Sequence, residues 1–120
     1  MPDSQKDAVR FFAIIKFMGD KEVEKWAINE ARKTVRRILK GVRIRAWFFG
    51  SRANGNARRF SDIDIALDGR GKHVPDEVMN NLYEAIEESL IPFRVEIMDM
   101  SKLNKDIKNK IKHEGRLWKD

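Results

Sequence analysis

Hydrophobic residues change their period at Val42, and few folds accommodate such a change within 120 residues. Before Val42 the apolar residues recur at helical spacing, first over residues 4–18 and then from Asp20 to Gly41. From Val42 to Phe48 they occupy alternate positions, which is the period of a β-strand. The chain therefore combines helices with a sheet, and its length suits one domain with one hydrophobic core.

The remaining chain predicts a loop or short helix, a second strand, a turn, a helix, a third strand and a last helix. These elements span residues 50–59, 62–67, 68–74, 75–89, 93–99 and 101–115, and Ser101 is the predicted cap of the last helix. The order predicts an α/β or α+β fold, in which helices pack on a small mixed β-sheet. We expect one domain over residues 1–120, with residues 1–41 as an N-terminal helical extension.

Composition excludes several classes of protein. Hydrophobic residues make up 42% of the chain and its charges are mixed in sign, unlike the composition of a disordered chain. No apolar run approaches the ~18 residues of a membrane span, and no secretory signal is visible at the N-terminus. The chain has no cysteine, which excludes disulfides and thiolate chemistry. We expect a soluble, cytoplasmic domain that does not contact a membrane.

The formal net charge of +6 leaves a nucleic-acid-binding module open as an alternative function. Neither basic cluster interleaves with aromatic residues as a single-strand stacking platform would, and solvated helix faces explain both clusters equally well. The clusters are Arg32, Lys33, Arg36, Arg37 and Lys40, and Lys102, Lys105, Lys108, Lys110 and Lys112.

Two carboxylates lie close together on the second predicted strand. Asp62 and Asp64 are two residues apart, so they share one face of the strand at a separation of roughly 7 Å, while Ile63 and Ile65 point into the core. Like charges at this distance repel each other unless a cation compensates them, and Mg²⁺ is the hard cation that suits carboxylate oxygens. An isolated Asp-x-Asp is more often a solvated strand face.

A second feature precedes this pair. The first strand runs into Gly50 and Ser51, whose backbone N–H groups and hydroxyl could cradle a phosphate, and the nearby Arg52, Arg58 and Arg59 could reach it. The Lys-Ser/Thr ending of a P-loop is absent. Taken alone, the loop is equally well explained as a turn.

Gly50-Ser51, ten intervening residues and then Asp62-Ile63-Asp64 form a long and specific signature. The stretch 47–67 resembles the nucleotidyltransferase superfamily of the DNA polymerase β type, and within it the minimal nucleotidyltransferases, or MNT group. The resemblance extends from about Val42 to the C-terminus and is weaker before it. It is carried by Gly50-Ser51, Arg52, Ala57-Arg58 and Ser61-Asp62-Ile63-Asp64 in WFFGSRANGNARRFSDIDIAL.

The resemblance implies a set of site residues. Asp62 and Asp64 match two metal-binding and catalytic carboxylates, and Glu96 stands where the family usually has a third acid, an Asp. Together they would hold two divalent ions, Mg²⁺ or alternatively Mn²⁺. Gly50 and Ser51 match the nucleotide-binding pair, and Arg52 is the further phosphate contact.

The resemblance also implies an activity and a partner. Such an enzyme transfers a nucleoside monophosphate, here AMP from ATP, to a hydroxyl, although another nucleoside triphosphate is not excluded by any motif. Members of the MNT group are commonly paired, as antitoxins, with a helical ribonuclease toxin of the HEPN type, which some of them adenylylate on tyrosine. The longer side chain of Glu96 leaves an alternative, in which a catalytically weak or inactive antitoxin acts by binding its partner.

The predicted first helix carries apolar residues on more than one face, namely Phe11, Phe12, Ile15 and Phe17. This pattern predicts a homo-oligomer or a helical partner bound through the segment. Packing of all four residues into the core of the domain is an equal alternative.

Overall fold

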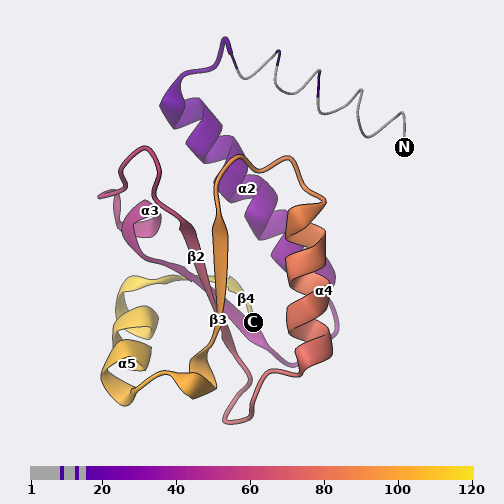
Figure 1. The fold of residues 1–120 in the computed structure, drawn as a ribbon. Coiled ribbons are helices and arrows are strands. Elements are labelled where there is room, and N and C mark those ends of the chain that lie inside the picture. The colour runs from indigo at the N-terminus through magenta and orange to yellow at the C-terminus, as the bar shows by residue number, and fades with distance from the viewer. Residues whose placement is uncertain (1–8, 10–12, 14–15) are drawn as a thin grey trace.

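The computed structural model describes residues 9, 13 and 16–120. Its elements are α2 (Asp20–Ile38), β1 (Arg45–Phe49), α3 (Ser51–Asn54), β2 (Ile63–Asp68), α4 (Asp76–Glu87), β3 (Val95–Asp99), the 3₁₀ helix η1 (Met100–Lys102), α5 (Lys105–Glu114) and β4 (Arg116–Lys119) (Figure 1). The helix predicted over residues 4–18 falls mostly outside the described residues, as does the contact expected from Phe11, Phe12 and Ile15. Among the helices described, none is long and apolar enough to cross a bilayer.

The four strands form one mixed sheet in the order β3-β2-β1-β4. Strand β1 is antiparallel to both β2 and β4, whereas β2 and β3 run parallel. Helices α2 and α4 contribute to the core on one face of the sheet, and η1 and α5 cover the other face. The mixed sheet with helices on it confirms the predicted α/β fold.

Alternation along β1 and β2 decides which face of the sheet holds the main core. Phe48, Ile63 and Ile65 are fully buried and point toward α2 and α4. Helix α2 meets them with Ala27 and Ala31, also fully buried, whose small side chains let the helix approach the sheet closely. The opposite face has a smaller core, built on Ala66, Met100 and Ile111.

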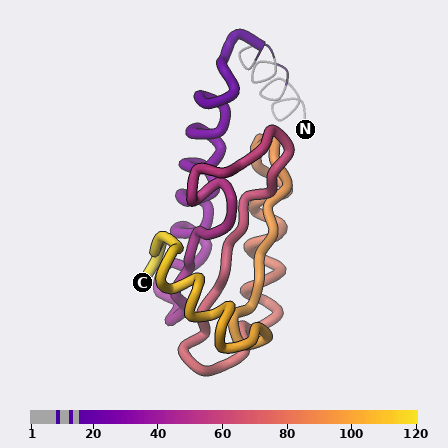
Figure 2. Tube along the Cα trace, turned by 90° about the vertical axis from the view of Figure 1, so that its left-hand side faces the viewer, coloured from indigo at the N-terminus to yellow at the C-terminus, as the bar shows by residue number. Residues whose placement is uncertain are grey.

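Strand β4 was not predicted from the sequence. Trp118 is the buried residue of this strand, and its ring stacks on that of Phe48 with centroids 4.6 Å apart. Figure 2 shows the yellow C-terminal end of the chain beside α2, which β4 contacts. A strand of four residues with one buried side chain is too short to produce an alternating pattern.

Two predicted boundaries were wrong. The first strand begins at Arg45 instead of Val42, because Arg45 pairs with Asp68, the last residue of β2, and no strand among the described residues pairs with the chain before it. The last helix is capped by Asn104, whose side chain accepts a hydrogen bond from the backbone N–H of Ile107 at 2.9 Å. Ser101 belongs instead to the preceding η1.

The outer edge of β3 is partly occupied by a side chain of α4. The hydroxyl of Tyr83 donates a hydrogen bond to the carbonyl oxygen of Ile97 at 2.9 Å. The same hydroxyl oxygen accepts a hydrogen bond from the backbone N–H of Ile97 at 3.3 Å. One side chain therefore satisfies both backbone groups of Ile97 that face away from β2.

Candidate active site

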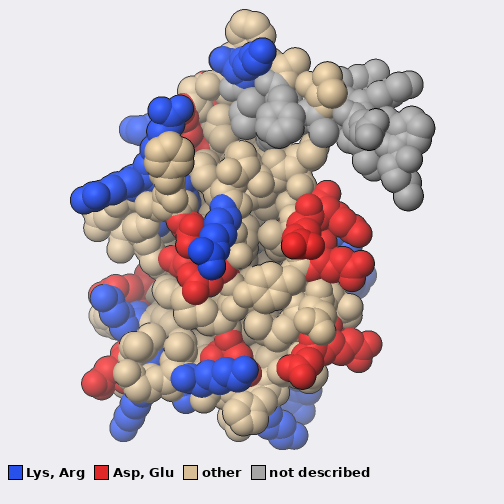
Figure 3. Space-filling view, in the orientation of Figure 1, with Lys and Arg blue, Asp and Glu red and all other residues tan. Residues whose placement is uncertain are grey.

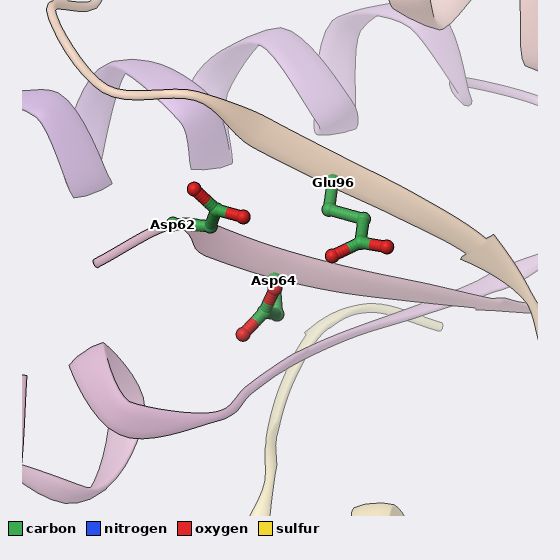
Figure 4. Close-up of side chains that lie close together, drawn as sticks. All are labelled: Asp62, Asp64 and Glu96. Carbon is green, nitrogen blue, oxygen red and sulfur yellow. The ribbon is translucent and has the colours of Figure 1, made fainter. Parts of the chain in front are cut away.

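The register of the sheet brings the acidic residues together. Asp64 on β2 pairs directly with Glu96 on β3, and directly paired residues point to the same face of a sheet. Asp62 lies two residues before Asp64 and so shares that face. Carboxylate oxygens of the three residues lie within 4.8 Å of one another, and Figure 4 shows the side chains grouped on the two strands. Asp62, Asp64 and Glu96 are called the carboxylate triad below.

The triad concentrates negative charge in a half-buried place. Burial, and then the charges of Glu96 and Asp62, raise the pKa of the Asp64 carboxyl to about 6. A bound cation would relieve this repulsion, and three carboxylates form an oxygen donor set that suits a hard divalent ion. The triad could therefore hold a metal ion, and the longer side chain of Glu96 reaches the cluster.

The connection between β1 and α3 lies directly against Asp64. Phe49, the last residue of β1, pairs with Asp64, and Gly50 follows with a φ of 83°. A β-carbon built on Gly50 would overlap Oδ2 of Asp64, so the Asp64 carboxylate would have to move to admit any other residue, and the positive φ also favours glycine. Figure 4 shows Asp64 pointing toward this connection.

A pocket opens beside the same connection, between α3 and α5. Gly50 and Ser51 line it on one side, and Ile107, Lys110 and Glu114 are among its lining residues on α5. Gly50 thus lies against Asp64, and both Gly50 and Ser51 border the open space of this pocket. Lys110 was not singled out as a site residue by sequence, because it is one of many lysines in a basic helix.

The position of the Arg52 side chain does not agree with its predicted role as a phosphate contact. Its side chain is buried, and its guanidinium donates a hydrogen bond to a carboxylate oxygen of Glu24 on α2 at 2.6 Å. Further hydrogen bonds go to backbone carbonyls of the loop before β2. The guanidinium is therefore engaged inside the protein. Nothing in the sequence signalled Glu24, which is 28 residues away from Arg52.

A mixed sheet that presents two acids on one strand and a third acid on its parallel neighbour, beside a Gly-Ser connection, defines a nucleotidyltransferase of the polymerase β type. Comparison with protein families agrees, since the family model described as polymerase beta, nucleotidyltransferase matches residues 33–119. The chain belongs to this family.

Similarity to one curated protein points to a narrower group within this family. A protein of Haemophilus influenzae, described as probable protein adenylyltransferase MntA, is 33% identical to this chain over 71 residues. The match covers 55% of this chain and 57% of that protein, so the chain spans little more than half the length of this relative. The similarity confirms the resemblance to the MNT group.

We expect binding of Mn²⁺ to weaken below about pH 6. A metal ligand must be deprotonated, and the Asp64 carboxyl has a pKa of about 6 in the metal-free protein. Below that pH the affinity should fall by roughly tenfold per pH unit, because one proton must leave for each ion bound. Calorimetric titration with Mn²⁺ from about pH 5 to pH 8 measures this dependence. Constant affinity over the range would contradict the assignment of Asp64 as a ligand.

Proposed function

We propose that this protein transfers AMP from ATP to a hydroxyl group of a partner protein. The observation that carries the proposal is the carboxylate triad, placed beside the glycine that the β1–α3 connection requires. Membership of the nucleotidyltransferase family and the similarity to a protein described as an adenylyltransferase support the same activity.

In the proposed reaction the acceptor oxygen forms a bond to the α-phosphorus of ATP, and the bond from that phosphorus to the bridging oxygen breaks. Pyrophosphate leaves with the electron pair of that bond, and the proton of the acceptor hydroxyl passes to water. Two Mg²⁺ ions, held by the triad, would supply activation of the hydroxyl and charge neutralisation at the triphosphate. We assign to Gly50 close backbone approach to the phosphates and to Ser51 a hydrogen bond from its hydroxyl.

Support for a macromolecular acceptor comes from the loop that leads into Asp62. Phe60, two residues before Asp62 in the sequence, is 87% exposed. The guanidinium of Arg59 lies 5.7 Å from the centroid of the Phe60 ring. An exposed aromatic ring in this loop is available for contact with a protein. We propose that the partner is a helical toxin of the HEPN type and that this chain acts as its antitoxin.

The face drawn in Figure 3 carries no continuous basic patch of the kind that favours nucleic-acid binding. The visible face carries both signs of charge, and acidic side chains gather over α4. Polyanion binding is favoured by a basic patch or stripe. The positive net charge of the chain is therefore not concentrated on this face.

Incubation of the protein with ATP, Mg²⁺ and a helical protein that co-purifies with it should add one adenylate to that protein, as measured by intact mass spectrometry. Replacement of Glu96 by Gln should reduce the rate by about a hundredfold or more, because a neutral amide is a poor substitute for a metal-binding carboxylate. Glu96→Asp, which restores the residue usual in the family, is the matched control and should remain active. A wild-type protein that binds its partner without modifying it would instead establish the binding-only antitoxin.

A further inference from the structure

Arg52 lies beside the loop that leads into Asp62 and binds that loop through its backbone. Its Nε donates a hydrogen bond to the carbonyl oxygen of Ser61 at 2.8 Å. Its Nη2 donates to the carbonyl oxygens of Arg59 and Arg58 at 3.1 and 3.4 Å. Three carbonyls from four successive residues therefore converge on one guanidinium. Ser61 directly precedes Asp62, so these bonds hold the backbone next to the first carboxylate of the triad.

The remaining contacts of Arg52 connect this loop to α2. Its Nη1 lies 2.6 Å from Oε2 of Glu24, and its Cζ lies 3.9 Å from the centroid of the Phe93 ring. The Arg52 side chain is only 3% exposed, and a charge so deeply buried needs a charged partner. Glu24 provides it from a part of α2 that precedes the residues matched by the family model.

We propose that the Arg52–Glu24 pair is a positioning element of the active site, which holds residues 58–61, and through them Asp62, in the arrangement that binds metal and nucleotide. Neither residue touches the reacting groups in this scheme. Groups that orient metal ligands typically change metal affinity by 10–100-fold when they are removed. The inference rests on the proposed function for its relevance to catalysis, whereas its test on metal binding does not require any transfer activity.

The alternative is that the pair contributes only to the stability of the fold. The two roles are distinguished by comparing the metal affinity of folded variants that have lost the same amount of stability. A stabilising contact lowers the melting temperature and leaves the metal affinity of the folded protein unchanged. A positioning contact lowers the metal affinity of the protein that is still folded.

The test compares Glu24→Ala, Glu24→Gln and Arg52→Lys with Val35→Ala in the full chain. Val35 is fully buried in the same helix, roughly 16 Å along its axis from Glu24, so its truncation destabilises the protein without contact to the site. Melting temperature, Mn²⁺ affinity by calorimetry, and hydrogen exchange of the amides of residues 58–62 are measured for each variant.

We expect Glu24→Ala to lose about 10–100-fold in Mn²⁺ affinity and to exchange faster at residues 58–62. Glu24→Gln keeps a hydrogen-bond acceptor and should lose less, and Val35→Ala should bind Mn²⁺ as the wild type does. If Glu24→Ala does not fold, Glu24→Gln and Arg52→Lys decide the question by the same two measurements. Wild-type affinity and exchange in every folded variant at this pair would overturn the proposal.

The proposed function fails separately. The transfer activity is rejected if the wild-type protein transfers no AMP. The positioning role is retained in that case if Glu24→Ala binds Mn²⁺ more weakly than the wild type. Full transfer activity together with unchanged Mn²⁺ affinity in Glu24→Ala would reject the positioning role and retain the transfer activity.

Discussion

Replacement of Asp64 by Asn should abolish the proposed AMP transfer, with a loss of about a thousandfold or more, while the protein remains folded. Asp64 is the central member of the triad, since it pairs with Glu96 across the sheet and lies two residues from Asp62. An amide of nearly the same shape preserves packing against Gly50 but removes the charge that holds a cation. The loss should appear both in transfer and in metal-dependent binding of ATP.

The melting temperature of Asp64→Asn tests whether this variant is misfolded. The folded-state pKa of Asp64, about 6, lies above its ordinary value of 3.8. The stability that follows from this difference is present below pH 3.8 and is lost as the pH rises through about 6. At about pH 8 the metal-free wild type therefore carries an unfavourable charge that Asn lacks. The melting temperature of Asp64→Asn should equal or exceed that of the metal-free wild type at this pH, and a much lower value would mean that the loss reflects unfolding.

Replacement of Gly50 by Ala should reduce both Mn²⁺ affinity and transfer by about a hundredfold or more. The new β-carbon would displace the Asp64 carboxylate, because Oδ2 occupies its space. Gly50 also has φ 83° and ψ −167°, a backbone region that is essentially restricted to glycine. Glycine at position 50 therefore leaves room for the Asp64 carboxylate, and this reason is independent of any approach of the triphosphate.

Gly55→Ala is the control for this prediction. Gly55 also has a φ of 83°, but a β-carbon there meets no atom within 4 Å. A left-handed Ala costs about 1–2 kcal/mol, so Gly55→Ala should lower the melting temperature and leave Mn²⁺ affinity unchanged. Equal losses of affinity in the two variants would show that backbone strain, and not displacement of Asp64, causes the effect.

The parts of the site that could be predicted from sequence are those set by local period and spacing. Alternation along β2 places Asp62 and Asp64 on one face, and the resemblance identified Glu96 as the third acid. Their convergence in space required the parallel pairing of β2 with β3, which no local pattern encodes.

The contacts of Arg52 could not be predicted in this way. An arginine after Gly-Ser looks like a phosphate ligand in sequence, because the motif shows its neighbours and not the direction of its side chain. Its direction depends on Glu24 in a distant helix and on the carbonyls of a loop that folds back over it. The short β4 was missed for a related reason, since its role depends on contact between Trp118 and Phe48.

The hydrogen bonds of Tyr83 to Ile97 restrict how a partner can attach to this domain. Edge strands often recruit a foreign segment by β-augmentation, in which backbone groups of the two chains pair. On β3 an incoming strand would have to displace the Tyr83 hydroxyl from both backbone groups of Ile97. A strand of a partner protein is therefore not expected to pair with β3 at Ile97, and the same hydroxyl protects this edge of the sheet from edge-to-edge aggregation.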